Sequence, residues 1–378
     1  MKFIHLSDLH LGKRISNFSM REDQAYILRE ILGVVEAEKP QAVLLAGDVY
    51  DQSVPSAEAM QLLDDFLFRL SELGAQIFVI SGNHDSAERV AFAARLLERS
   101  GVHLSPAYDG VVRPTLLQDE FGPVAVYLLP FVKPAQLRRC FPEETIESYT
   151  DALRAAVAHM EIDPGVRSVL VAHQFVTGAQ RSESEEISIG GLDNVDAEVF
   201  APFDYVALGH LHSPQHIGRE TLRYCGTPLK YSFSETARKS VTVVELGKKG
   251  APVAVRTVPL TPLHDMRCLR GCYAELMRRD SYAGTATDDY LSVTLTDEED
   301  VPDAMRKLQT VYPNLMKLAY DNTRTRTERA LGAARDPELR SEGELFEELY
   351  EKQNGKPMSE KQRAYALALL EEIREGSR

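Results

Sequence analysis

Short apolar runs alternate with longer amphipathic stretches in the first part of the chain. The runs at 42–46 and 77–80 contain only apolar residues, which is typical of parallel strands covered on both faces. Other apolar positions recur at helical spacing, and Pro40 and Gly74 end two of these stretches. The pattern predicts strands at 2–7, 42–46 and 77–80, and helices at 20–38, 56–73 and 87–99. This alternation is typical of an α/β fold.

The pattern becomes richer in strands toward the middle of the chain. It predicts a helix at 143–161 and strands within 111–129 and at 167–172, 204–208, 240–246 and 252–258. No helix separates the last two strands. An α/β half joined to a strand-rich half predicts two packed sheets flanked by helices.

Pro259 and Pro262 mark the expected end of this large domain. Beyond them, an alternating strand at 290–296, a short helix and a strand at 315–320 predict a small α+β module. The last residues contain two further helical stretches. We therefore expect three parts, at 1–262, 263–332 and 333–378.

The C-terminal part is predicted to contain helices at 344–350 and 359–373, and Ser359 with Gln362 forms a capping-box pattern at the start of the second. These helices carry more apolar side chains than two isolated helices can cover, namely Phe346, Leu349, Tyr350, Leu367, Leu369 and Leu370. The side chains could pack back onto the protein. We favour a docking site for a helix of a partner protein.

The overall charge argues against a simple DNA-binding module. The chain has 43 basic and 57 acidic residues, a formal net charge of −14, whereas proteins that bind DNA alone usually carry a basic surface. Nucleic-acid binding would therefore depend on local patches, on metal ions or on a partner.

Composition also bears on the compartment. No apolar run approaches the ~18 residues of a membrane span, and the chain starts directly with a predicted strand, so we expect neither a membrane segment nor a signal peptide. The four scattered cysteines are too few for a disulfide framework. A reducing cytoplasm is the expected location.

Residues suited to metal binding follow five of the predicted strands. The candidate ligands are Asp8, His10, Asp48, Asn83, His173, His210 and His212. Each short motif alone could be an ordinary turn, but the ends of strands in α/β sheets are where ligands bind. Mixed oxygen and imidazole ligands favour Mn²⁺, Fe²⁺ or Zn²⁺ over Mg²⁺ or Ca²⁺.

Seven side chains are too many for one ion, and they suit two ions that share a carboxylate. Asp48 is the natural bridge, because its strand lies between the others. Two cations would lower the barrier to attack on an anionic phosphodiester and hold a hydroxide between them. His84, beside a ligand but not needed as one, is the candidate general acid. Asp85 is expected either to orient His84 or to cap the following helix.

The motifs Asp-x-His, Gly-Asp, Gly-Asn-His-Asp and Gly-His-x-His, in that order, resemble those of the calcineurin-like metallophosphoesterases. The resemblance implies a four-layer αββα sandwich. It also implies that one metal is held by Asp8, His10, Asp48 and His212, and the other by Asp48, Asn83, His173 and His210.

Longer runs are similar to the SbcD family, the nuclease subunits of bacterial SbcCD complexes. They include Asp8-Leu9-His10-Leu11-Gly12, Gly82-Asn83-His84-Asp85-Ser86, Ser188-Ile189-Gly190-Gly191, Tyr224-Cys225-Gly226-Thr227-Pro228 and Ser232-Phe233-Ser234-Glu235. This resemblance is close over about 1–260 and looser beyond.

The resemblance implies a Mn²⁺-dependent nuclease of DNA replication, repair and recombination: a double-strand 3'–5' exonuclease and a single-strand and hairpin endonuclease. It implies a coiled-coil ATPase partner of the SbcC type, a homodimer of this chain within a heterotetramer, and a nucleoid-associated location in the cytoplasm. Residues 263–332 would cap the DNA, and 333–378 would dock on the coiled coil of the partner.

One catalytic position departs from part of the superfamily. Archaeal and eukaryotic relatives carry a second catalytic histidine after the Gly-Asp motif, where this chain has Asp51. Asp51 is a candidate for ordering His84 or the substrate, and we do not assign it acid catalysis.

Contacts to DNA are harder to predict. The candidates are Lys13, Arg14, Arg89, Arg324 and Arg326, each of which could equally be a solvated surface residue. Two alternatives remain for the whole chain. One is a stand-alone nucleotide or cyclic-nucleotide phosphodiesterase, and the other is a catalytically silent scaffold, which would be expected to have lost several ligands.

Overall fold

The computed structural model describes residues 1–180, 193–326, 346–347, 349–351 and 357–376. Contacts divide the chain into two compact units. The first unit comprises Met1–Cys268 and Asp288–Ser292, and the second comprises Leu269–Thr287 and Val293–Arg378. All seven candidate metal ligands belong to the first unit.

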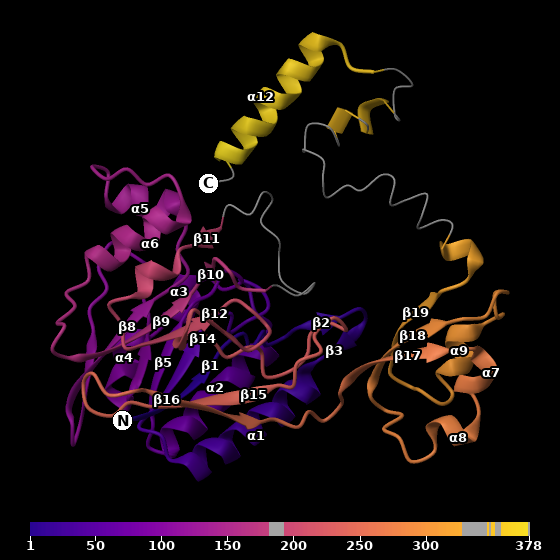
Figure 1. The fold of residues 1–378 in the computed structure, drawn as a ribbon, viewed down its shortest axis with the longest axis horizontal. Helices are drawn as coiled ribbons and strands as arrows, with labels where there is room; N and C mark the ends of the chain where they lie inside the picture. Colours follow the sequence, from indigo (N-terminus) through magenta and orange to yellow (C-terminus); the bar gives the residue numbers. More distant parts are fainter. Residues whose placement is uncertain (181–192, 327–345, 348, 352–356, 377–378) are drawn as a thin grey trace. The chain divides into compact units, whose positions relative to one another are not determined.

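A six-stranded sheet forms the first layer of β-structure in the large unit (Figure 1). Its order is β16-β15-β1-β4-β5-β6, with the last four strands parallel and the first two added antiparallel. The strands are β1 (Lys2–Leu6), β4 (Ala42–Ala46), β5 (Gln76–Ile80), β6 (Val102–Leu104), β15 (Ser240–Glu245) and β16 (Ala254–Pro259).

A second six-stranded sheet has the order β13-β14-β12-β9-β8-β7. Its four central strands are parallel, and an antiparallel strand closes each edge. The strands are β7 (Thr115–Asp119), β8 (Gly122–Leu129), β9 (Arg167–His173), β12 (Tyr205–Gly209), β13 (Gln215–Ile217) and β14 (Arg219–Tyr224).

The two sheets pack face to face through alternate residues of their strands. Leu44 and Phe78 of the first sheet share a buried cluster with Val171 and Tyr205 of the second. Because side chains alternate across a strand, the intervening residues point to the outer faces, where helices cover them. The central strands are therefore buried on both faces, which explains their wholly apolar sequences.

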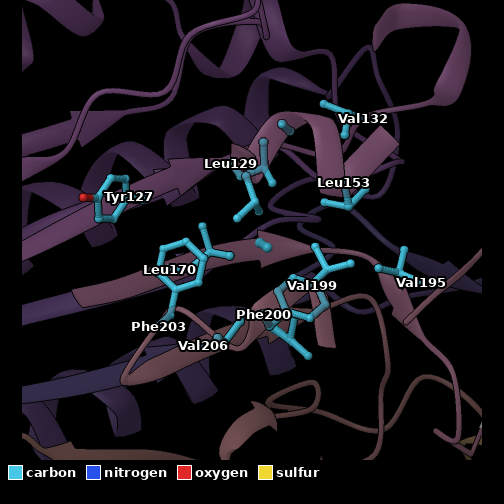
Figure 2. Close-up of a cluster of buried hydrophobic side chains, with 14 of the residues drawn as sticks. Tyr127, Leu129, Val132, Leu153, Leu170, Val195, Val199, Phe200, Phe203 and Val206 are labelled. Atoms are coloured by element: carbon cyan, nitrogen blue, oxygen red, sulfur yellow. The ribbon is translucent and has the colours of Figure 1, made fainter. Parts of the chain in front are cut away.

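Helices form the outer layers. α1 (Arg21–Glu38) and α2 (Ala57–Glu72) lie beside the first sheet in Figure 1. On the outer face of the second sheet, α6 (Tyr149–Ala158) and η2 (Ala197–Phe200) cover the strands. Figure 2 shows Leu153 of α6 in one cluster with Leu129, Leu170, Phe200 and Phe203. The predicted four-layer αββα sandwich is confirmed.

Some helices differ from the prediction. The stretch predicted as one helix at 87–99 is broken into α3 (Ala87–Val90), α4 (Ala94–Leu97) and η1 (Glu98–Ser100), because Ala93 takes a left-handed φ of 60°. The helix predicted at 143–161 begins only at Tyr149, where Ser148 and Asp151 form a capping box. One helix, α5 (Pro134–Cys140), was not predicted from the sequence; it begins at a proline.

Several short strands were also not predicted individually. They are the pair β2 (Arg14–Ile15) and β3 (Phe18–Ser19), the pair β10 (Phe175–Val176) and β11 (Asn194–Val195), and the strands β13 and β14. Their runs are too short or too polar for a clear alternating pattern.

The C-terminal part begins with a three-stranded sheet of order β17-β18-β19, formed by β17 (Met266–Gly271), β18 (Tyr290–Leu295) and β19 (Leu315–Tyr320). Its helices are α7 (Tyr273–Leu276), α8 (Arg279–Tyr282) and α9 (Ala304–Leu308). The predicted α+β character is confirmed, although β17, α7 and α8 were not foreseen.

The last helix is α12 (Glu360–Gly376). Ser359 Oγ accepts a hydrogen bond from the backbone N–H of Gln362, and the Gln362 side chain accepts one from the backbone N–H of Ser359, as the capping-box pattern predicted. Among the apolar residues in question, Phe346, Leu349, Leu367 and Leu369 are exposed. The helix start at 344–345 and the run Ser188-Ile189-Gly190-Gly191 lie outside the described residues. No described helix combines the length and apolar character that crossing a membrane requires.

Candidate metal centre

The predicted ligands lie where strands of both sheets end. Asp8, Asp48 and Asn83 follow β1, β4 and β5 of the first sheet, while His173 ends β9 and His210 follows β12 of the second. The loops after β1 and β4 are joined by backbone hydrogen bonds, from Asp8 N to Gly47 O (3.0 Å) and from His10 N to Asp48 O (2.9 Å). Parallel pairing of β1 and β4 thus continues into the loops and brings their polar residues together.

Four ligand residues hold a backbone conformation that side chains disfavour. Asp8, His10, Asp48 and His210 have φ values of 53°, 45°, 47° and 100°. A non-glycine residue in such a region costs on the order of 1–3 kcal/mol, and residues of this kind cluster at functional sites. The fold therefore gives up stability to orient these four side chains.

One group of ligands surrounds the amide oxygen of Asn83. Asn83 Oδ1 lies 3.0 Å from His173 Nε2 and 2.9 Å from His210 Nδ1. The other ring nitrogen of His173 lies 2.8 Å from the backbone oxygen of Ala46, so Nδ1 carries the proton and Nε2 faces the centre. These are the three residues predicted to share one metal with Asp48.

A second group contains Asp8, His10 and His212, with one ligand atom from each within 4.8 Å of the others. His10 is 1% exposed, and Nε2 of its ring has no hydrogen-bond partner among the described residues. A buried polar nitrogen without a partner is costly, and a metal ion would satisfy it. His212 Nδ1 lies 3.1 Å from Glu235 Oε1, which leaves its Nε2 to face the site.

Asp48 lies between the two groups. Its Oδ2 is 3.8 Å from His10 Nε2 in one group and 3.4 Å from His173 Nε2 in the other. Asp8, Asp48 and His173 also bring ligand atoms within 4.8 Å of one another. Two carboxylates, one amide oxygen and four imidazoles in this arrangement fit two divalent ions that share Asp48.

The concentrated charges shift the pKa values of these groups. Burial lowers the pKa of His10 to about 4. Burial also lowers the pKa of His173, but the Asp48 carboxylate outweighs it and raises that pKa to about 9. Asp48 in turn has a pKa well below its usual range, because the His173 charge overcomes the effect of burial. Without metal, a proton on His173 thus balances Asp48, and metal binding at His173 must release it.

His84 lies at the open side of the centre. Its side chain is 24% exposed, its Nε2 is 3.9 Å from Asp48 Oδ2, and its backbone N–H donates to Asp48 Oδ1 (2.9 Å). The other ring nitrogen, Nδ1, lies 3.3 Å from the backbone oxygen of Asp51. The ring is therefore positioned near the predicted ligands and remains partly accessible to solvent.

The two carboxylates predicted to support His84, Asp85 and Asp51, make other contacts. Asp85 accepts hydrogen bonds from the backbone N–H groups of Val49, Tyr50 and Gly82, at 2.9–3.0 Å. It joins the loops after β4 and β5, while Ser86 caps the short helix α3. Asp51 Oδ1 accepts a hydrogen bond from Lys13 Nζ (2.6 Å) and lies 3.5 Å from His10 Nδ1.

The structure adds residues that the sequence analysis did not assign to the site. Glu235 is 2% exposed and contacts both His212 and Lys239 Nζ, the latter at 2.5 Å. Gln24 Nε2 donates to the backbone oxygen of His10 (2.7 Å). The only signal for Glu235 was its place in the family-like run at 232–235, and nothing in the sequence around Gln24 relates it to His10.

The predicted DNA contacts all have partners within the protein. Arg14 and Arg89 donate to the backbone oxygens of Asn17 and Ser53. Arg324 makes a two-point ion pair with Asp300, and Arg326 pairs with Asp321. Lys13 is paired with Asp51, as described above. Their role in binding DNA stays a prediction.

Family models and curated relatives match most of this chain. The family model described as calcineurin-like phosphoesterase matches residues 1–214, and the model described as type 5 capsule protein repressor C-terminal domain matches residues 262–354. A protein of Staphylococcus saprophyticus, named as the D subunit of the nuclease SbcCD, is 34% identical over 323 residues, 84% of each chain. Its namesake in Staphylococcus epidermidis is 33% identical over 324 residues, 84% of this chain and 85% of that one.

Among solved structures, a dimetal phosphatase from Danio rerio covers 70% of this chain and 98% of its own, with a TM-score of 0.43 and 12% identity. That likeness is too weak to carry an argument. The family model and the two curated relatives are sufficient to assign the family. The chain belongs to the calcineurin-like phosphoesterases and, within them, to the SbcD family of SbcCD nuclease subunits.

Proposed function

We propose that this chain is a metal-dependent DNA nuclease that hydrolyses phosphodiester bonds together with an ATPase partner of the SbcC type. The observation that carries this proposal is that the seven candidate ligands, from the strand ends of two sheets, form two groups and that Asp48 lies between them. The curated relatives are named nuclease subunits, which favours this function over a stand-alone cyclic-nucleotide phosphodiesterase.

The residues divide the chemical work between them. Asp8, His10, Asp48 and His212 would hold one divalent ion, and Asp48, Asn83, His173 and His210 the other. Bound ions supply positive charge to the phosphate oxygens and activate a water for attack. We propose manganese as the resident metal, because the donor set mixes imidazole with hard oxygen.

His84 gives its proton to the leaving oxygen of the DNA strand. Three features support this role: partial exposure, proximity of Nε2 to Asp48, and the backbone oxygen of Asp51 beside Nδ1. With a hydrogen bond from Nδ1–H to the Asp51 backbone oxygen, Nε2 is the nitrogen that donates the proton to the leaving oxygen. The Asp51 carboxylate then has a supporting role, since it contacts Lys13 and approaches His10.

The remaining parts extend the proposal to DNA and partner. Residues 263–332 would cap the DNA, with Lys13, Arg14, Arg89, Arg324 and Arg326 contacting phosphates. Residues 333–378 would dock on the coiled coil of the ATPase, and exposed Phe346, Leu349, Leu367 and Leu369 support this role. The complex would cleave duplex ends in the 3'–5' direction and open hairpins. It would act on the nucleoid in DNA replication, repair and recombination, and it would contain a dimer of this chain.

A comparison of His84→Ala with the unaltered chain tests the assignment. With Mn²⁺ and the ATPase partner, we expect His84→Ala to cut linear duplex and hairpin DNA about 10²–10⁴-fold more slowly, the usual contribution of a general acid. Metal binding, measured by calorimetry, should persist. His216→Ala is the matched control, because that side chain is 46% exposed and pairs only with Glu220 among its described ionic contacts. Unchanged turnover in His84→Ala would remove His84 as the acid.

A further inference from the structure

A small cavity adjoins the ligands of the Asn83 group. Its volume is about 160 Å³, and Asn83 and His210 form part of its wall. A single water needs at least about 10–15 Å³ and takes about 30 Å³ in the liquid, so the cavity has room for several water-sized groups. That is the size class of a single nucleobase.

Three aromatic rings line this cavity. Phe131 and Tyr149 have centroids 6.5 Å apart at an interplanar angle of 39°. Phe131 also packs edge-on against His173 at 6.2 Å, and Phe175 packs against His210 at 6.4 Å. The aromatic surface is therefore continuous with two of the predicted metal ligands.

The fold holds these rings on anchored backbone. Phe131 follows β8, and its backbone N–H donates to Ser81 O (2.9 Å) at the end of β5. Tyr149 is the first residue of α6, directly after the Ser148 capping box. Phe175 begins β10. A cavity with walls on three anchored elements is preformed, which lowers the cost of binding.

The polar part of the wall offers hydrogen-bond acceptors. Gln174 is 1% exposed, its Nε2 donates to Val132 O (3.2 Å), and its Oε1 has no hydrogen-bond partner within the described part of the chain. The Asp193 carboxylate also lines the cavity. The buried Gln174 oxygen favours a ligand that brings an N–H group and disfavours a phosphate, whereas the exposed Lys133 suits a phosphate outside the cavity.

The geometry points to a binding site for one unpaired nucleobase, belonging to a nucleotide that adjoins the scissile phosphate. Aromatic walls suit any base, since every base has a π-face, and the acceptors suit its N–H edge. Because the cavity matches the size of one base, a base that enters it must leave the stack of its strand, which favours single strands, frayed ends and hairpin loops. This inference rests on the proposed function, since it names the substrate element that the same centre receives.

Fluorescence of 2-aminopurine tests the site without catalysis. The probe is a set of single-stranded oligonucleotides with 2-aminopurine at successive positions, mixed with the full chain in chelator. Stacking should quench the probe strongly at one position. Tyr149→Ala should lose that quenching, Tyr149→Phe should restore it because the ring returns, and Phe121→Ala should retain it. Phe121 is an exposed ring on the turn between β7 and β8. Quenching that is absent at every position, or equal in Tyr149→Ala, would overturn the inference.

Cleavage kinetics locate the base relative to the cut. With Mn²⁺ and the ATPase partner, an abasic site beside the scissile phosphate should lower kcat/KM of the unaltered chain by about 5- to 150-fold, the range that base–aromatic stacking supplies. Tyr149→Ala should show the same loss on normal DNA and little further loss on abasic DNA. If the abasic site lowered kcat/KM equally for the unaltered chain and for Tyr149→Ala, the proposed base site would be wrong. Absence of cleavage of normal DNA by the unaltered chain with Mn²⁺ and the ATPase partner would instead contradict the proposed function. The quenching result would still show whether the base site exists.

Discussion

At the scale of single residues, the centre depends on backbone positions that leave no space for additional atoms. A Cβ added at Gly82 would lie 2.1 Å from Asp48 Oδ1 and 2.4 Å from Asp48 N. Asp48 itself is held at a φ of 47°. The site is thus built by close approach of the loops after β4 and β5, and a small side chain at Gly82 is incompatible with it.

Gly82→Ala should therefore displace the shared carboxylate. We expect Mn²⁺ affinity to fall by at least about 10-fold, the scale of effects from groups that support metal ligands, and DNA cleavage to fall with it. Calorimetric titration with Mn²⁺ measures the first effect. Gly33→Ala is the control, because Gly33 lies in α1 with nothing within 4 Å of an added Cβ, and it should gain about 0.5–1 kcal/mol of stability. Normal Mn²⁺ affinity in Gly82→Ala would show that the close approach is not needed.

A second prediction concerns an ion pair far from the metal ligands. Arg167 is 3% exposed and donates to both carboxylate oxygens of Asp119. These hydrogen bonds hold the pKa of Asp119 well below its usual range. Because the pKa is lowered in the folded state, the stabilisation is complete above the unfolded carboxyl value of about 4 and is lost as the pH falls below it.

The substitution Asp119→Asn should lower the free energy of unfolding at pH 7 by about 2 kcal/mol, the scale of hydrogen bonds to charged groups. As the pH falls from 5 to 3, the variant should lose less stability than the unaltered chain. Thermal unfolding in chelator across this range measures both effects. The control is Asp65→Asn, which breaks the exposed Asp65–Arg69 pair and should change stability little. Parallel pH curves for Asp119→Asn and the unaltered chain would contradict the account.

At the scale of helices and strands, the buried parallel strands were the most predictable elements. Their apolar runs are short, bounded and covered on both faces, as β4 and β5 show. The helices near the centre were less predictable. Nothing in the sequence around Ala93 indicates its left-handed conformation, and the capping box at Ser148 competes with the apolar spacing that suggested an earlier start of α6. Local geometry decides such boundaries, and a periodic pattern does not contain it.

Asp85 connects the two loops that follow β4 and β5, because its carboxylate accepts hydrogen bonds from backbone N–H groups of both. Replacing it with alanine removes three hydrogen bonds to backbone N–H groups. We expect Asp85→Ala to weaken Mn²⁺ binding by about 10- to 100-fold and to lower the thermal unfolding temperature in chelator. If Asp85 acts mainly by orienting His84, the variant would keep its Mn²⁺ affinity and lose only turnover, and calorimetry beside steady-state kinetics separates these outcomes.

At the scale of the whole molecule, the centre exists only because the strands of two packed sheets end at the same place. The sequence was sufficient to name all seven ligand candidates, because each follows a recognisable strand. It could not show that Asn83 of the first sheet lies within 3.0 Å of His173 of the second. Glu235 was missed for the same reason, since its contact with His212 depends on the fold of the segment that follows β14. Contacts between distant segments come from topology, which residue spacing does not contain.

Anomalous diffraction from crystals of the full chain grown with Mn²⁺ would show whether two metal ions share Asp48. We predict two manganese peaks per chain, one on each side of the Asp48 carboxylate, the first beside His10 and His212 and the second beside Asn83 and His210. In Asp48→Asn crystals, occupancy of both peaks should fall. A single peak, peaks elsewhere, or two peaks unaffected by Asp48→Asn would contradict a centre of two metals that share Asp48.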